Sequence, residues 1–115
     1  MKHLSIAKQR DFFKPLIASR NVQAATMVLK AGQSSSDQVE NEHPKAEQWL
    51  YVIAGAGRAK VGRRAVRLKA GSLLLVEKNE PHQISNTGDE PLVTVNFYSP
   101  PAYTKKGEVK PSVKR

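Results

Sequence analysis

Short apolar segments separated by turn residues recur about every eight to twelve residues between positions 22 and 98. Each has the length and alternation of a β-strand, and Gly or Asn residues between them permit tight turns. Even spacing of short strands is typical of a β-sandwich or barrel, so the pattern predicts an all-β fold. The expected strands are Val22–Leu29, Gln48–Ile53, Arg58–Val61, Ala65–Leu68, Ser72–Val76, His82–Ser85 and Leu92–Tyr98.

Two other stretches depart from this pattern. Residues 4–18 fit either a short helix or an edge strand, because Pro15 interrupts any longer helix. The stretch Gly32–Lys45 is long and polar, and long loops inside compact domains are more often functional than idle.

Alternation within the strands indicates where side chains point. Both faces of Gln48–Ile53 are apolar, so we expect this strand to be covered on both sides, inside a sandwich or at a subunit contact. His82 shares its face with Ile84, so its imidazole is expected to point inward. For Leu92–Tyr98, either set of alternate residues could face the interior.

Composition narrows the chemistry. The 115 residues are 39% hydrophobic and 25% charged, which suits one globular domain. The chain has no cysteine, which excludes disulfides, thiolate metal sites and cysteine nucleophiles. No apolar run is long enough for a membrane span, and the charged N-terminus does not resemble a secretory signal, so we expect a cytoplasmic protein.

The positive charge lies mainly at the two ends. The net charge is +9, of which residues 1–20 and 103–115 contribute +4 each and residues 21–102 only +1. We therefore divide the chain into an N-terminal extension (1–20), a β-barrel domain (21–102) and a basic, disordered tail (103–115). A basic cluster within Arg58–Lys69 is expected to be a solvated strand face, and without interleaved aromatic residues we do not expect a nucleic-acid partner.

Two of the three histidines are candidates for a site. His43 ends the long loop and His82 begins a later strand, and each adjoins a proline that restricts the backbone. Two imidazoles with one or two oxygen donors suit zinc, iron, manganese or nickel. On spacing alone, the alternative remains that His43 is a loop residue and His82 a core histidine.

Residues 22–99 resemble the small single-domain cupins. The first cupin motif is matched by Asn41-Glu42-His43, followed by Gln48, six further residues and then Gly55. The second is matched by Gly71, by Pro81-His82 and by Asn86. The segments WLYVIAGAG and HQISNTGDEPL also look like the family. Asn41 stands where the family has its first histidine, and Glu77 and Asn79 replace a proline and a glycine of the second motif.

The resemblance implies a double-stranded β-helix, also called a jelly-roll barrel, with flexible basic extensions. It implies that His43, Gln48 and His82 bind a divalent metal ion, with Asn41 as a fourth ligand. Glu47 is the alternative to Gln48, but strand alternation favours Gln48. Like other small cupins, the chain is expected to form a homodimer.

Three functions stay open on this reading. The first is a metal-dependent isomerase, lyase or dioxygenase acting on a small polar metabolite, with the acid–base residue unassigned. The second is a metal-free cupin that binds a sugar or another metabolite without catalysis. The third is a nucleic-acid-associated protein that uses its basic ends.

Overall fold

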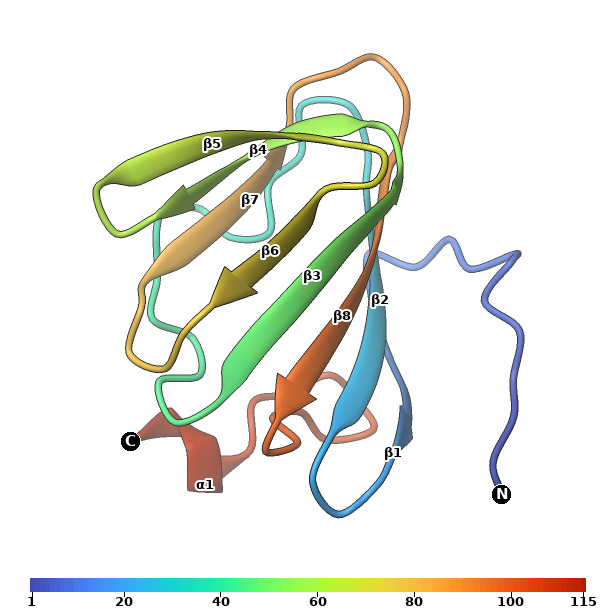
Figure 1. Ribbon diagram of the computed structural model, residues 1–115, viewed down its shortest axis with the longest axis vertical. Coiled ribbons are helices and arrows are strands. Elements are labelled where there is room, and N and C mark those ends of the chain that lie inside the picture. The colour runs from blue at the N-terminus through green and yellow to red at the C-terminus, as the bar shows by residue number, and fades with distance from the viewer.

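The eight strands of the protein form two antiparallel sheets (Figure 1). The computed structural model describes residues 1–115. The larger sheet has the strand order β1 (Phe13–Ala18), β2 (Gln23–Leu29), β8 (Leu92–Ser99), β3 (Glu47–Ala54) and β6 (Leu73–Val76). The smaller sheet has the order β5 (Arg64–Lys69), β4 (Ala56–Val61) and β7 (His82–Asn86). The predicted all-β fold is confirmed, and residues 4–18 contribute the edge strand β1, not a helix.

The inner faces of the two sheets form one apolar core. Leu50 and Val52 of β3 and Leu92 of β8 meet Ala59 of β4 and Ile84 of β7, and all five side chains are buried. Because side chains alternate along each strand, the same register that buries Leu50 and Val52 also turns Gln48 inward. The core therefore fixes the position of a polar side chain in the barrel.

The chain passes between the sheets at a tight crossing after β3. Gly55 joins β3 to β4 with a φ of +91°, a conformation that glycine adopts without steric cost. A Cβ at Gly55 would also collide with the backbone of Pro91, and one at Gly57 would collide with the Ser85 carbonyl. These two glycines permit the close approach of β4 to β7 and to the start of β8.

The C-terminal segment packs against the barrel, which differs from the expectation of a disordered tail. Tyr103 is bridged to Val109, and the chain ends in a short helix, α1 (Pro111–Lys114). Val113 of this helix is 1% exposed and lies in a second core cluster with Tyr98 and Tyr103. The net charge of residues 103–115 predicted a solvated tail. A count of charges does not include apolar side chains such as Tyr103 and Val113, which anchor this segment in the core.

The outer face of β3 is apolar and open to solvent. Trp49 lies opposite Leu75 and Phe97, and Tyr51 lies opposite Leu73, with all of these side chains exposed. We expected both faces of β3 to be covered. The interior of the sandwich covers the face that carries Gln48, whereas the face that carries Trp49 is exposed.

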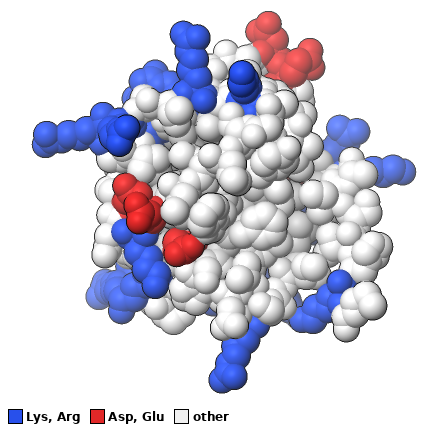
Figure 2. All heavy atoms as spheres, in the orientation of Figure 1, with Lys and Arg blue, Asp and Glu red and all other residues white.

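Charged side chains surround the molecule and leave the centre of the view uncharged (Figure 2). The basic side chains of the β4–β5 hairpin, such as Arg58 and Arg67, are exposed, as expected for a solvated strand face. No helix in the structure has the length and apolar character needed to cross a membrane.

Replacing Val113 by alanine tests whether the tail belongs to the fold. Removing two buried methyl groups should lower the free energy of unfolding by about 1–3 kcal/mol. The matched control is Val66→Ala on β5, where the side chain is 48% exposed. That change should stay within about 0.5 kcal/mol. Urea unfolding measures both, and equal effects at the two positions would contradict an ordered tail.

Candidate functional site

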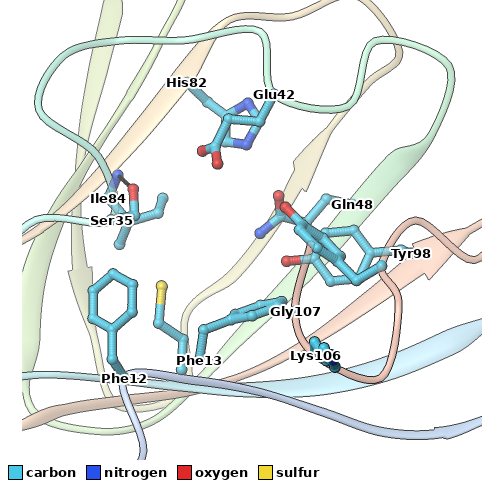
Figure 3. Close-up of a pocket in the computed structure, with 12 residues that line it drawn as sticks. Phe12, Phe13, Ser35, Glu42, Gln48, His82, Ile84, Tyr98, Lys106 and Gly107 are labelled. Carbon is cyan, nitrogen blue, oxygen red and sulfur yellow. Dashed lines mark hydrogen bonds between the residues drawn. The ribbon is translucent and has the colours of Figure 1, made fainter. Parts of the chain in front are cut away.

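A cavity of about 280 Å³ opens between the inner faces of the sheets (Figure 3). Strand residues Gln48, His82 and Tyr98 contribute polar atoms to its wall. The two chain ends add Phe13 and Tyr103, which are in contact with each other at a ring-centroid distance of 4.6 Å. The cavity is therefore formed jointly by the barrel and by its extensions.

The two candidate histidines lie side by side, and His82 is the one that lines the cavity. His43 comes from the loop before β3 and is 2% exposed, and His82 begins β7 and is 3% exposed. Their ring centroids lie 4.9 Å apart. The spatial proximity expected from the motifs is thus present, although 38 positions of sequence separate the two residues.

Backbone carbonyls determine which nitrogen each imidazole offers. His43 Nδ1 lies 3.0 Å from the Ala46 carbonyl oxygen, and His82 Nδ1 lies 2.9 Å from that of Glu80. A carbonyl oxygen can only accept, so each Nδ1 carries the proton. In the neutral rings, both Nε2 atoms then keep their lone pairs, which is the tautomer that a metal-binding histidine needs.

A chain of side-chain amides continues from His43. Gln48 Oε1 lies 3.0 Å from His43 Nε2, while Gln48 Nε2 donates to Asn96 Oδ1 at 3.0 Å. Asn96 Nδ2 donates in turn to Thr94 Oγ1 at 3.0 Å. Asn96 and Thr94 are fully buried on β8, and the sequence analysis did not identify them as site residues. The sequence did contain a signal for these two residues, because their polar side chains alternate with the same period as the apolar Leu92 and therefore share its face of the strand.

The contact between His43 and Gln48 bears directly on metal binding. With the His43 proton on Nδ1, Nε2 and Gln48 Oε1 are two acceptors that face each other at 3.0 Å. A cation bound by both atoms would stabilise this pair. The alternative is that both amides are reversed, so that Gln48 donates to His43, Asn96 to Gln48, and the Thr94 hydroxyl to Asn96. Without an ion, only this reversed arrangement gives every group in the chain a hydrogen-bond partner.

The other proposed ligands lie elsewhere. Asn41 is exposed and lines a separate depression beside Lys114 and Arg115, so the structure does not bring it to the histidines. The longer loop accounts for this difference from the motif. Glu47 faces the opposite side of β3, where its Oε2 accepts a hydrogen bond from Trp49 Nε1 at 2.6 Å. No group of three or more His, Cys, Asp or Glu side chains is close enough to bind a metal, which leaves the two histidines and Gln48.

Burial shifts the titration of the groups around the cavity. Burial lowers the pKa of His82 from 6.5 to about 4, and the neighbouring His43 adds to this effect. Burial, with a smaller contribution from the charge of Glu40, raises the pKa of Glu42 from 4.5 to about 7. Burial also raises the pKa of both Tyr98 and Tyr103, so their hydroxyls stay protonated near neutral pH. Glu42 is therefore the cavity carboxyl whose proton is most easily exchanged near neutral pH.

These two shifts affect stability in opposite directions. Folded Glu42 binds its proton more tightly than the unfolded chain does, so its contribution is complete below pH 4.5 and is lost as the pH rises through 7. Folded His82 binds its proton less tightly, so its contribution is present above pH 6.5 and is lost as the pH falls towards 4.

Glu42→Gln isolates the carboxyl contribution in metal-free protein. Above pH 7 the variant should be more stable than the parent by about 1–2 kcal/mol, which is less than the full shift implies because Glu42 is only half-buried. Below pH 4.5 the difference should vanish. Urea unfolding across this range measures it, with Glu90→Gln at an exposed position as the control. A gain in stability that is the same at every pH would contradict an origin in the ionisation of Glu42.

Comparison with known proteins agrees with the sequence motifs. Residues 25–98 match the cupin domain family. The tetracenomycin polyketide synthase protein TcmJ of Streptomyces glaucescens is 35% identical over 61 residues, which are 53% of this chain and 41% of that protein. The chain spans between 41% and 53% of the length of the curated relatives it matches.

Solved structures agree as well. The crystal structure of BH2720 from Bacillus halodurans has a TM-score of 0.77 and 25% identity, over 89% of this chain and 79% of that one. A predicted oxalate decarboxylase from Thermotoga maritima has a TM-score of 0.67 and 23% identity, over 76% and 77% of the two chains, and this likeness concerns the fold alone. The family match covers most of the barrel and includes all three candidate ligands, so this chain is a member of the cupin family.

Proposed function

We propose that this cupin binds one divalent metal ion through His43 Nε2, His82 Nε2 and Gln48 Oε1, and that the ion binds oxygen atoms of a small metabolite in the cavity. The observation that carries the proposal is the cluster of three side chains: the Gln48 amide lies 3.0 Å from His43 Nε2, and the His43 and His82 ring centroids lie 4.9 Å apart. Zinc, iron, manganese and nickel all accept imidazole and amide oxygen donors. A bound ion of this kind would polarise a ligand oxygen as a Lewis acid.

The chain's own residues would serve this ion in distinct ways. Asn96 orients Gln48 by accepting from its Nε2, which directs Oε1 towards His43. The carbonyls of Ala46 and Glu80 hold the two rings in the required tautomer. Because all three proposed ligands are neutral, the positive charge of the ion would remain available to a ligand oxygen.

Two kinds of group are available for proton transfer and hydrogen bonding. Glu42 lines the cavity and, with a pKa of about 7, can either hold or accept a proton near neutral pH. Tyr98 and Tyr103 also line it, and their neutral hydroxyls can donate to a ligand oxygen. This set suits proton movement next to a polarised oxygen, as in an isomerase or a lyase. A dioxygenase would use the same ligands with iron.

Metal binding should depend on His82 and should not depend on His3, the histidine outside the proposed site. Protein purified without a histidine tag should contain about one transition metal ion per chain by elemental analysis. His82→Ala removes one ligand and should lower the metal affinity measured by calorimetry by about 100-fold or more. His3→Ala, in an exposed position, should not change it. Equal affinities for the two variants would contradict the proposed site.

The second candidate function is metal-free binding of a small metabolite. It is favoured by the reversed amide arrangement, in which the chain from Thr94 to His43 is satisfied without an ion. The same calorimetric titration separates the two functions, since this alternative requires a folded parent protein without measurable metal affinity.

We also propose that the outer face of the larger sheet forms a homodimer contact. Soluble monomers rarely expose a large continuous apolar patch, and a twofold contact buries the same patch on both subunits. A second copy of this chain offers a face of the same apolar chemistry. The exposed apolar side chains of this face include Trp49, Tyr51, Ile53, Leu73, Leu75 and Phe97.

Leu73→Arg should convert the dimer to a monomer. The side chain is 67% exposed, so the change should leave the fold intact while placing a desolvated charge in the contact. Val66→Arg on the smaller sheet is the matched control and should remain dimeric. Sedimentation equilibrium measures the mass of each, and a monomeric parent protein would contradict the proposed contact.

A further inference from the structure

The wall of the cavity is divided into a polar side and an apolar side. Figure 3 shows His82, Glu42 and Gln48 towards the top and right of the cavity. Phe12, Phe13 and Ile84 lie along its lower and left sides, with Ser35 beside Ile84, and Met27 also lines the cavity. Gln48 and His82 therefore lie on one side, and a mainly apolar surface faces them.

The aromatic part of this apolar surface comes from outside the segment that matches the family. Phe12 and Phe13 precede the segment 25–98 that matches the family, and Tyr103 and Gly107 follow it. The Phe12 carbonyl accepts a hydrogen bond from the Val28 amide at 3.1 Å, which fixes the chain where its ring reaches the cavity.

The C-terminal segment supports the same wall. Phe13 is held against Tyr103 at a ring-centroid distance of 4.6 Å. A Cβ at Gly107 would lie 3.6 Å from the Phe13 ring, so the loop passes directly against it. The two chain ends thus build an aromatic wall that the barrel alone does not supply.

The small volume of the cavity and its division into a polar and an apolar side limit the kinds of ligand that fit. A volume of about 280 Å³ is at the lower end of ligand pockets, so the molecule is compact. A polyhydroxylated sugar would lose hydration from its hydroxyls against Phe12, Met27 and Ile84 without gaining hydrogen bonds. A hydrocarbon ring would gain from burial on that side while its oxygen atoms reach the polar side.

We propose that the cavity takes a compact ring-bearing ligand, with metal-binding oxygens at one end and an aromatic or alicyclic ring against Phe12 at the other, and that Phe12 determines this specificity. Only the metal-binding oxygens of this ligand rest on the proposed function. The ring of the ligand would be recognised by side chains that are not metal ligands.

Three hydroxamates with one shared head group test the ring end. Benzohydroxamate carries a phenyl ring, acetohydroxamate a methyl group, and gluconohydroxamate a polyhydroxylated chain. Because all three bind metal through the same two oxygens, differences in affinity report on the body of the molecule. Calorimetry on metal-loaded protein should show benzohydroxamate binding about tenfold or more tightly than either of the others.

Phe12→Ala should remove this preference, while Val22→Ala should keep it. The two apolar side chains are 44% and 40% exposed, but only Phe12 lines the cavity. Thermal unfolding at an unchanged midpoint will show that the Phe12 variant retains the fold, and Phe12→Leu should retain part of the preference.

Each outcome bears on one of the two proposals. Tighter binding of acetohydroxamate or gluconohydroxamate, failure of benzohydroxamate to bind, or an unchanged preference in Phe12→Ala would overturn the ligand class. A protein that binds no metal would overturn the proposed function instead. The comparison of benzohydroxamate with acetohydroxamate on that metal-free protein would still decide whether the aromatic wall selects a ring.

Discussion

Two hydrogen bonds to backbone carbonyls determine what this site can do. The Ala46 carbonyl accepts from His43 and the Glu80 carbonyl from His82, which fixes the ring orientation and the tautomer of both imidazoles. Both carbonyls belong to turns that lead into strands, so the ring geometry follows from the strand register. A shift of either strand would move its turn and change the nitrogen that faces the cavity. The site is therefore as rigid as the sheets that carry it.

The strand β3 combines two environments in one alternating sequence. Gln48 begins the inward set and is held by Asn96 across the sheet, while Trp49 begins the outward set. Polar residues deep in a barrel are costly unless their hydrogen bonds are satisfied, and the chain of amides from Gln48 to Thr94 meets that requirement. An apolar outer face is costly in a different way, because it leaves a large surface that favours association. The same eight residues thus contribute both to the candidate site in the interior and to the proposed dimer contact on the outside.

The sequence predicted the barrel well, because alternation and turn residues report directly on strands. It predicted the meeting of His43 and His82, and it ranked Gln48 above Glu47 for the physical reason seen in the structure, namely the face of the strand. It did not exclude Asn41, since the path of a long loop depends on tertiary contacts that spacing does not contain. The ordered tail was missed for a related reason. Charge dominates residues 103–115, but Tyr103 and Val113 find partners only once the barrel exists.

Because both chain ends help to close the cavity, the proposed metal ligands and the aromatic residues of the cavity wall come from different parts of the chain. His43, Gln48 and His82 belong to the segment that matches the family, whereas Phe12, Phe13 and Tyr103 lie outside it, towards the two ends of the chain. For a cavity that binds a ligand as proposed, substitutions at these ends would change which ligand fits, while the interior amide and imidazole groups stay unchanged. Related barrels with divergent termini are expected to differ in selectivity sooner than in their inner chemistry.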